Sequence, residues 1–123
     1  MLNYKSFQKG GKVSVWIGDF ATYDDFDSYL SIGGQFELDF GFLLDELNLP
    51  ESTVEESSES IQNLVNGFSW SDSYTESVIQ AASRIGINKA TTMVVFHNFE
   101  FDSSKVRVDP KALLVFLGTF SFS

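Results

Sequence analysis

The side chains best suited to acid–base or nucleophilic chemistry in this sequence are carboxylates, hydroxyls and one imidazole. The chain of 123 residues has 17 Asp and Glu, one His and no Cys. His97 could serve as a general base only beside a nucleophile that it activates. No nucleophile-elbow motif accompanies any of the serines. We therefore expect His97 to be a hydrogen-bonded, half-buried side chain and predict no catalytic residues.

Three neighbouring aspartates, Asp24, Asp25 and Asp27, are the best candidates for binding a cation. A calcium-binding loop needs Gly at its sixth position and Glu at its twelfth. Counted from Asp25, these positions hold Leu30 and Phe36. The acids are instead typical of the start of a helix, where the helix dipole favours negative charge. The sequence thus predicts no metal site and no cofactor.

The negative charge is concentrated in a segment without cations. The net charge is −9, and between Lys12 and Arg84 the chain has no Lys, Arg or His. Many carboxylates of this segment must stay solvated, because burial of an unpaired charge is costly. Their field repels nucleic acid and anionic lipid and attracts basic partners. We therefore expect no binding to nucleic acid or membranes, with plain solubility as the simplest alternative reading of the charge.

An aromatic segment, residues 67–74, lies between two expected helices. It contains Trp70 and Tyr74, residue types that often anchor protein interfaces. The alternative is that its aromatic side chains cover the core beneath the loop.

The elements that must position these residues indicate an α+β domain. Period-2 alternation predicts a strand over residues 12–17, and Thr22 is the expected N-cap of a helix over about 23–31. Short helices are expected near 35–40 and from about 58, separated by an exposed loop over 51–60. The Ser73–Glu76 pattern of a capping box predicts the start of a further helix that ends at Gly86.

The C-terminal third is predicted to form three strands. Residues 91–96 are apolar and β-branched, and this strand continues into the alternating residues 99–101. Residues 106–108 alternate in the same way and form a hairpin with 99–101, and residues 112–122 form the last strand. We expect a single domain with a mainly antiparallel sheet of about four strands, one N-terminal and three C-terminal. Several helices should cover one face of the sheet. Residues 1–11 are expected to form a flexible N-terminal arm, and residues 12–123 the domain.

Several segments together resemble the immunity protein 22 family. Residues 13–20 (Val-Ser-Val-Trp-Ile-Gly-Asp-Phe), followed by Phe26 and Tyr29-Leu30, are similar to the opening of that family. Residues 67–74 (Gly-Phe-Ser-Trp-Ser-Asp-Ser-Tyr) resemble its central aromatic and serine-rich stretch. Residues 93–101 and 116–120 resemble its C-terminal hairpin and final strand. The likeness covers most of residues 13–122.

The resemblance implies a bacterial immunity protein of polymorphic toxin systems, with an α+β fold and no catalysis of its own. The chain departs from the family pattern at Asp19, where Asn is expected, and over residues 31–35, which are shorter and less acidic than usual. The second departure touches a region that could help choose the partner, so it leaves the identity of the toxin open.

The leading hypothesis is a cytoplasmic protein that binds and neutralises a cognate toxin domain, a basic nuclease, as a monomer or weak homodimer. Acids would steer the encounter and aromatic anchors would hold the complex. The residues expected to contact the partner are Asp24, Asp25, Asp27, Glu55, Glu56, Glu59, Trp70, Asp72 and Tyr74. The alternatives are an acidic adaptor or scaffold domain for another partner, and a metal-dependent hydrolase that uses paired carboxylates.

Overall fold

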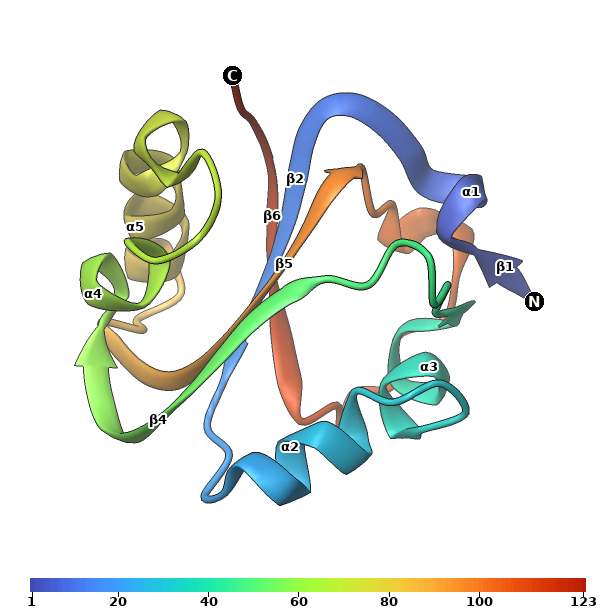
Figure 1. The fold of residues 1–123 in the computed structure, drawn as a ribbon, viewed down its shortest axis with the longest axis horizontal. Helices are drawn as coiled ribbons and strands as arrows, with labels where there is room; N and C mark the ends of the chain where they lie inside the picture. Colours follow the sequence, from blue (N-terminus) through green and yellow to red (C-terminus); the bar gives the residue numbers. More distant parts are fainter.

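A four-stranded antiparallel sheet forms the centre of the molecule, with the strands in the order β4-β5-β2-β6 (Figure 1). The computed structural model describes residues 1–123. The sheet strands are β2 (Gln8–Gly18), β4 (Glu51–Ser60), β5 (Lys89–Phe99) and β6 (Leu114–Ser121). Two short strands, β1 (Leu2–Asn3) and β3 (Phe42–Leu43), pair in parallel beside it. The expected α+β class is confirmed.

Helices cover both faces of the sheet, not one face as expected (Figure 1). Val13, Val15 and Ile17 of β2 pack with the helices α4 and α5. Trp16, which lies between Val15 and Ile17 in the sequence, packs on the opposite face of the sheet. This follows from the alternation of side chains along a strand. The helices are α1 (Tyr4–Phe7), α2 (Tyr23–Tyr29), α3 (Gln35–Phe40), α4 (Ile61–Val65) and α5 (Thr75–Arg84), with 3₁₀ turns η1 (Ser71–Ser73) and η2 (Ser103–Lys105).

The core on the side of α1, α2 and α3 is aromatic. Trp16 is fully buried, and its ring centroid lies 5.5 Å from that of Phe36, 5.6 Å from Phe40 and 4.9 Å from Phe116. The opposite core, beneath α4 and α5, is mainly aliphatic. Each face of the sheet is therefore covered by its own hydrophobic core.

The expected loop over residues 51–60 is strand β4, at the edge of the sheet. It pairs with β5 through Glu51–Val95 to Val54–Thr92 and then again at Glu59–Ala90. The sequence of β4 did not predict a strand, because an edge strand made mainly of Ser and Glu shows no apolar alternation. Four residues, 55–58, bulge out opposite the single residue Thr91, and such bulges protect an edge from pairing with other chains.

The expected C-terminal hairpin is absent, and β2 lies between β5 and β6. The backbone N–H of Glu100 donates to the Phe7 carbonyl at 2.8 Å, and that of Phe101 donates to the Ser14 hydroxyl at 3.0 Å. Phe101 is buried in the aromatic core. Its burial and these two bonds replace the expected strand pairing, so the sheet has one strand from the middle of the chain and two from the C-terminal third.

The N-terminal residues are packed onto the domain, in contrast to the expected arm. Tyr4 and Phe7 are buried, and the Tyr4 hydroxyl donates to the His97 carbonyl oxygen at 2.9 Å. Asn3 caps helix α1 by accepting from the N–H of Ser6. The rings of Tyr4 and Phe7 therefore belong to the aromatic core.

Helix starts were predicted with mixed success. Thr22 caps α2 and accepts from the N–H of Asp25 at 3.1 Å, as expected. The capping box at residues 73–76 is wrong, because Ser73 lies in η1 and donates to the Trp70 carbonyl, and α5 begins without a side-chain cap. Gly86 follows α5 with φ of +79°, as expected of a helix-ending glycine.

Candidate functional site

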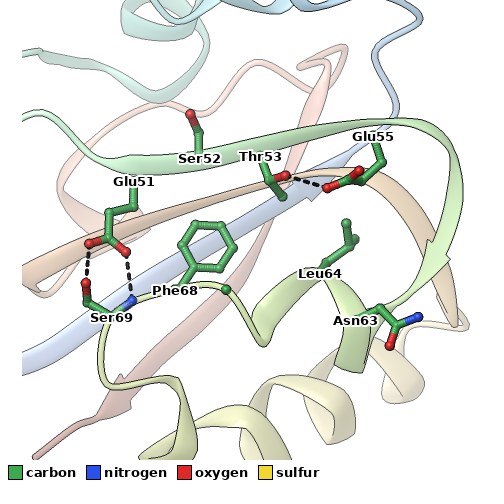
Figure 2. Close-up of a pocket in the computed structure, with 9 residues that line it drawn as sticks. Glu51, Ser52, Thr53, Glu55, Asn63, Leu64, Phe68 and Ser69 are labelled. Atoms are coloured by element: carbon green, nitrogen blue, oxygen red, sulfur yellow. Dashed lines mark hydrogen bonds between the residues drawn. The ribbon is translucent and has the colours of Figure 1, made fainter.

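A groove of about 490 Å³ runs between strand β4 and the segment from α4 to η1 (Figure 2). Phe68 and Leu64 point from the α4 side towards β4, which contributes polar side chains. We call this feature the β4 groove; its lining residues are Glu51, Ser52, Thr53, Glu55, Asn63, Leu64, Gly67, Phe68 and Ser69. Two carboxylates and no cation line it.

Glu51 bridges β4 to the aromatic segment. Its carboxylate accepts from the N–H of Ser69 at 2.8 Å and from the Ser69 hydroxyl at 2.6 Å (Figure 2). Partial burial alone would raise the pKa of Glu51. The two bonds from Ser69 and the charge of His97 outweigh this effect and hold the pKa below its usual value. The carboxylate of Glu51 is therefore ionised, and its two hydrogen bonds with Ser69 fix its orientation.

A second hollow, of about 300 Å³, lies on the other side of Glu51, at the end of β5. Trp70 and two leucines, Leu47 and Leu49, line it and are all exposed. We call it the Trp70 hollow; its lining residues are Tyr4, Leu47, Asn48, Leu49, Glu51, Trp70, His97 and Asn98. Glu51 lines both the β4 groove and the Trp70 hollow, so the two meet at this residue, and together they make up the candidate site.

Trp70 is held in place although it is 61% exposed. Its ring centroid lies 6.0 Å from that of His97 and 5.6 Å from that of Phe122. Its backbone has φ of +55°, a conformation that costs a residue with a side chain of this size about 1 kcal/mol or more. Such strain at an exposed aromatic residue is a reason to look for function there.

His97 holds the aromatic segment, residues 67–74, through a hydrogen bond to its backbone. Its Nε2 lies 3.0 Å from the Ser69 carbonyl oxygen, and because a carbonyl can only accept, Nε2 carries the proton. The imidazole is half-buried, and its ring lies nearly perpendicular to that of Phe122, with the two ring centroids 5.3 Å apart. His97 thus fixes the backbone that carries Trp70.

Tyr74, expected to contact a partner, is buried with 1% exposure. Its hydroxyl donates to the Ser69 carbonyl oxygen at 2.8 Å. Burial, followed by the charge of Glu51, raises the pKa of Tyr74 well above 10.0. Tyr74 therefore supports the segment from inside and does not offer a surface to a partner.

The expected acidic contacts lie in separate places. Glu55 and Glu56 are exposed in the bulge of β4, and Glu59 is half-buried where pairing resumes. Asp72 is exposed in η1, two residues after Trp70. The structure thus brings acids of β4 and η1 to the elements that border the β4 groove.

The acids of α2 are not part of this site. Asp24, Asp25 and Asp27 are all exposed, but α2 packs on the aromatic core, on the face of the sheet opposite α4 (Figure 1). Two further acids of the cation-free segment are buried. Glu37 accepts from the N–H groups of Gly33 and Leu44, and Asp39 accepts from neutral side chains.

Several residues of the candidate site are not predicted by the sequence. Glu51 lies in the segment expected to be an exposed loop, and His97 is expected to have only a structural hydrogen bond. Leu47 and Leu49 carried a usable signal, because two leucines beside Pro50 in a short non-periodic segment are poorly placed to reach a core. No group of three or more His, Asp or Glu side chains is arranged to hold a metal ion.

Residues 13–123 match the protein family described as Immunity protein 22. The chain belongs to this family. The match spans nearly the whole chain, as the resemblance of the four quoted segments indicated, and the family implies a function in immunity against a toxin. No curated protein and no solved structure matches the chain. None of the helices has the length and apolar composition needed to cross a membrane.

Proposed function

We propose that this chain neutralises a cognate toxin domain by binding it across the β4 groove and the Trp70 hollow. The observation that carries the proposal is the position of Trp70, an exposed indole held over His97 and Phe122 beside the ionised carboxylate of Glu51. Tryptophan is one of the residue types most enriched in interface hot spots, and a rigid tryptophan loses little conformational freedom on binding.

The proposed partner is basic, and a nuclease is the class that best fits. A nuclease must carry cations to bind the phosphates of its substrate. The chain has a net charge of −9, and the lining of the β4 groove and the Trp70 hollow contains acids and no Lys or Arg. Complementary charge of this kind speeds association and excludes other partners.

The acids divide into two roles in this proposal. Glu55, Glu56 and Asp72 border the site and contact the toxin, as does Glu59. The acids of α2 lie on the other face and contribute only to the long-range field that attracts the toxin. The α2 acids, which the sequence predicts to contact the partner, act only at a distance in this proposal because they lie on the opposite face of the sheet.

The test is to co-express the chain with the toxin domain encoded beside it and to measure rescue of growth and complex formation. Binding kinetics are then measured for a β4 variant (Glu55→Lys with Glu56→Lys) and for an α2 control (Asp24→Lys with Asp25→Lys). Both changes alter the net charge equally. Both should slow association, at low salt most strongly, and only the β4 variant should also speed dissociation.

The proposal fails if the wild-type chain neither rescues growth nor binds the toxin. The assignment of the surface fails if the two double variants change dissociation equally, or if neither changes binding or its dependence on salt.

A further inference from the structure

The Trp70 hollow differs from the rest of the surface in its exposed apolar rim. Leu47 is 86% exposed, Trp70 61% and Leu49 57%. These three side chains line one cavity, together with the carboxylate of Glu51. Exposed apolar side chains that gather around one hollow, rather than lying singly, mark a binding site.

The charge of the hollow selects what can enter it. Glu51 is the only carboxylate in its lining, and the lining contains no Lys or Arg. Each of the two carboxylate oxygens accepts one hydrogen bond from Ser69. A carboxylate has about four acceptor positions, so each oxygen can accept a further bond. An apolar occupant would strip water from these oxygens without replacing it, which is costly.

We infer that the Trp70 hollow receives one arginine side chain of the toxin, whose guanidinium pairs with Glu51 and stacks on Trp70. The inference rests on the proposed function and names the chemistry of the contact. Ser69 already spans the two oxygens of Glu51, so the guanidinium donates one N–H to a remaining acceptor position of the carboxylate. Its planar face stacks on the indole, which the ammonium of lysine cannot do. The aliphatic stem of the arginine lies against Leu47 and Leu49.

The hollow is already formed before the toxin arrives. The ring of Trp70 packs on His97 and Phe122. The Ser69 carbonyl accepts hydrogen bonds from His97 and Tyr74, and the Ser69 N–H donates to Glu51. Little conformational freedom is left to lose when the arginine binds, which favours a long-lived complex.

The experiment measures the dissociation constant and dissociation rate of the complex with the toxin domain. Trp70→Ala and Glu51→Gln should each weaken binding at least tenfold, mainly through faster dissociation. Leu47→Ser changes a side chain that makes little contact with the protein, so it tests the rim without risk to folding; it should weaken binding about threefold or more. Asp27→Asn removes the same charge as Glu51→Gln from the opposite face and should leave the dissociation rate unchanged.

Each arginine and lysine of the toxin is then changed to alanine and combined with Glu51→Gln. One arginine should show strong coupling to Glu51: the double change should raise the dissociation constant about tenfold less than the product of the two single fold-changes. The inference is overturned if the wild-type chain binds but Trp70→Ala and Leu47→Ser leave binding unaltered. It is also overturned if the residue coupled to Glu51 is a lysine, or if none is coupled. Absence of binding by the wild-type chain would instead overturn the proposed function.

Discussion

The hydrogen bond between Tyr29 and Asp39 joins helix α2 to helix α3 and is open to a direct test. The Tyr29 hydroxyl donates to Oδ2 of Asp39 at 2.6 Å, and the two residues are 4% and 3% exposed. The other side-chain donor to Asp39 is Gln35, at 2.9 Å. Tyr29→Phe removes one oxygen atom and leaves the packing of the ring unchanged, so the variant isolates the bond.

The expected loss follows from the charge and the burial. A hydrogen bond to a charged group contributes about 1.5–3 kcal/mol, and the buried carboxylate would lose one of its few donors. Tyr29→Phe should therefore lower the free energy of unfolding by about 2 kcal/mol. A chain of this length has a total of roughly 6–18 kcal/mol. The corresponding fall in the melting temperature is about 8 °C.

Urea and thermal unfolding followed by circular dichroism measure both quantities. Tyr23→Phe is the matched control, because Tyr23 lies on the same helix and is 63% exposed; it should change stability by less than about 0.5 kcal/mol. A Tyr29→Phe variant as stable as Tyr23→Phe would refute the reasoning, and Asp39 would then have to be stabilised by other groups.

Two further predictions concern pH and backbone conformation. Burial above all raises the pKa of Tyr29 and of Tyr74 from 10.0, so the folded state holds these protons more tightly. The resulting stability is fully present below pH 10 and is lost as the pH rises above it; urea unfolding at about pH 9 and pH 11 should show the loss, and Tyr29→Phe should reduce it. Gly41 has φ of +76°, and a Cβ there would lie 2.8 Å from Cβ of Val106. Gly41→Ala should cost about 1–3 kcal/mol in unfolding experiments, and Val106→Gly, which removes the Cβ that it would meet, should relieve the steric part when Gly41→Ala is compared with Gly41 in the Val106→Gly background.

Local signals in the sequence predicted the elements whose cause is local. The N-cap at Thr22 and the glycine after α5 each follow from hydrogen bonds or dihedral angles within a few residues. The helix expected from about residue 58 is α4, which begins three residues later, at Ile61. The alternation of β2 and the apolar β5 were equally visible, because both strands are buried. These elements fixed the α+β class.

The errors lie where distant residues decide the structure. Strand β4 pairs through its backbone along an edge, so its Ser and Glu side chains gave no pattern. The partners of Glu100 and Phe101 are Phe7 and Ser14, about ninety residues away in the sequence. No propensity of the local segment could reveal that these bonds replace a hairpin.

The candidate site was predicted only in part. Trp70 was identified from its residue type and its place between helices. Tyr74 has the same residue-type signal, but as the residue directly before helix α5 it is buried, and its hydroxyl donates to the Ser69 carbonyl. Glu51 and His97 acquire their roles only through Ser69, a contact between β4, β5 and the aromatic segment that sequence spacing does not encode.

The two tryptophans lie in opposite environments, and this gives the molecule two built-in optical reporters. Trp16 is enclosed by aromatic rings in the core, whereas Trp70 meets solvent at the candidate site. An indole in water emits at longer wavelengths than one in an apolar interior, because polar solvent relaxes around its excited state. Fluorescence from Trp16 should therefore follow unfolding, and a blue shift of Trp70 should follow engagement of the toxin, without any attached dye.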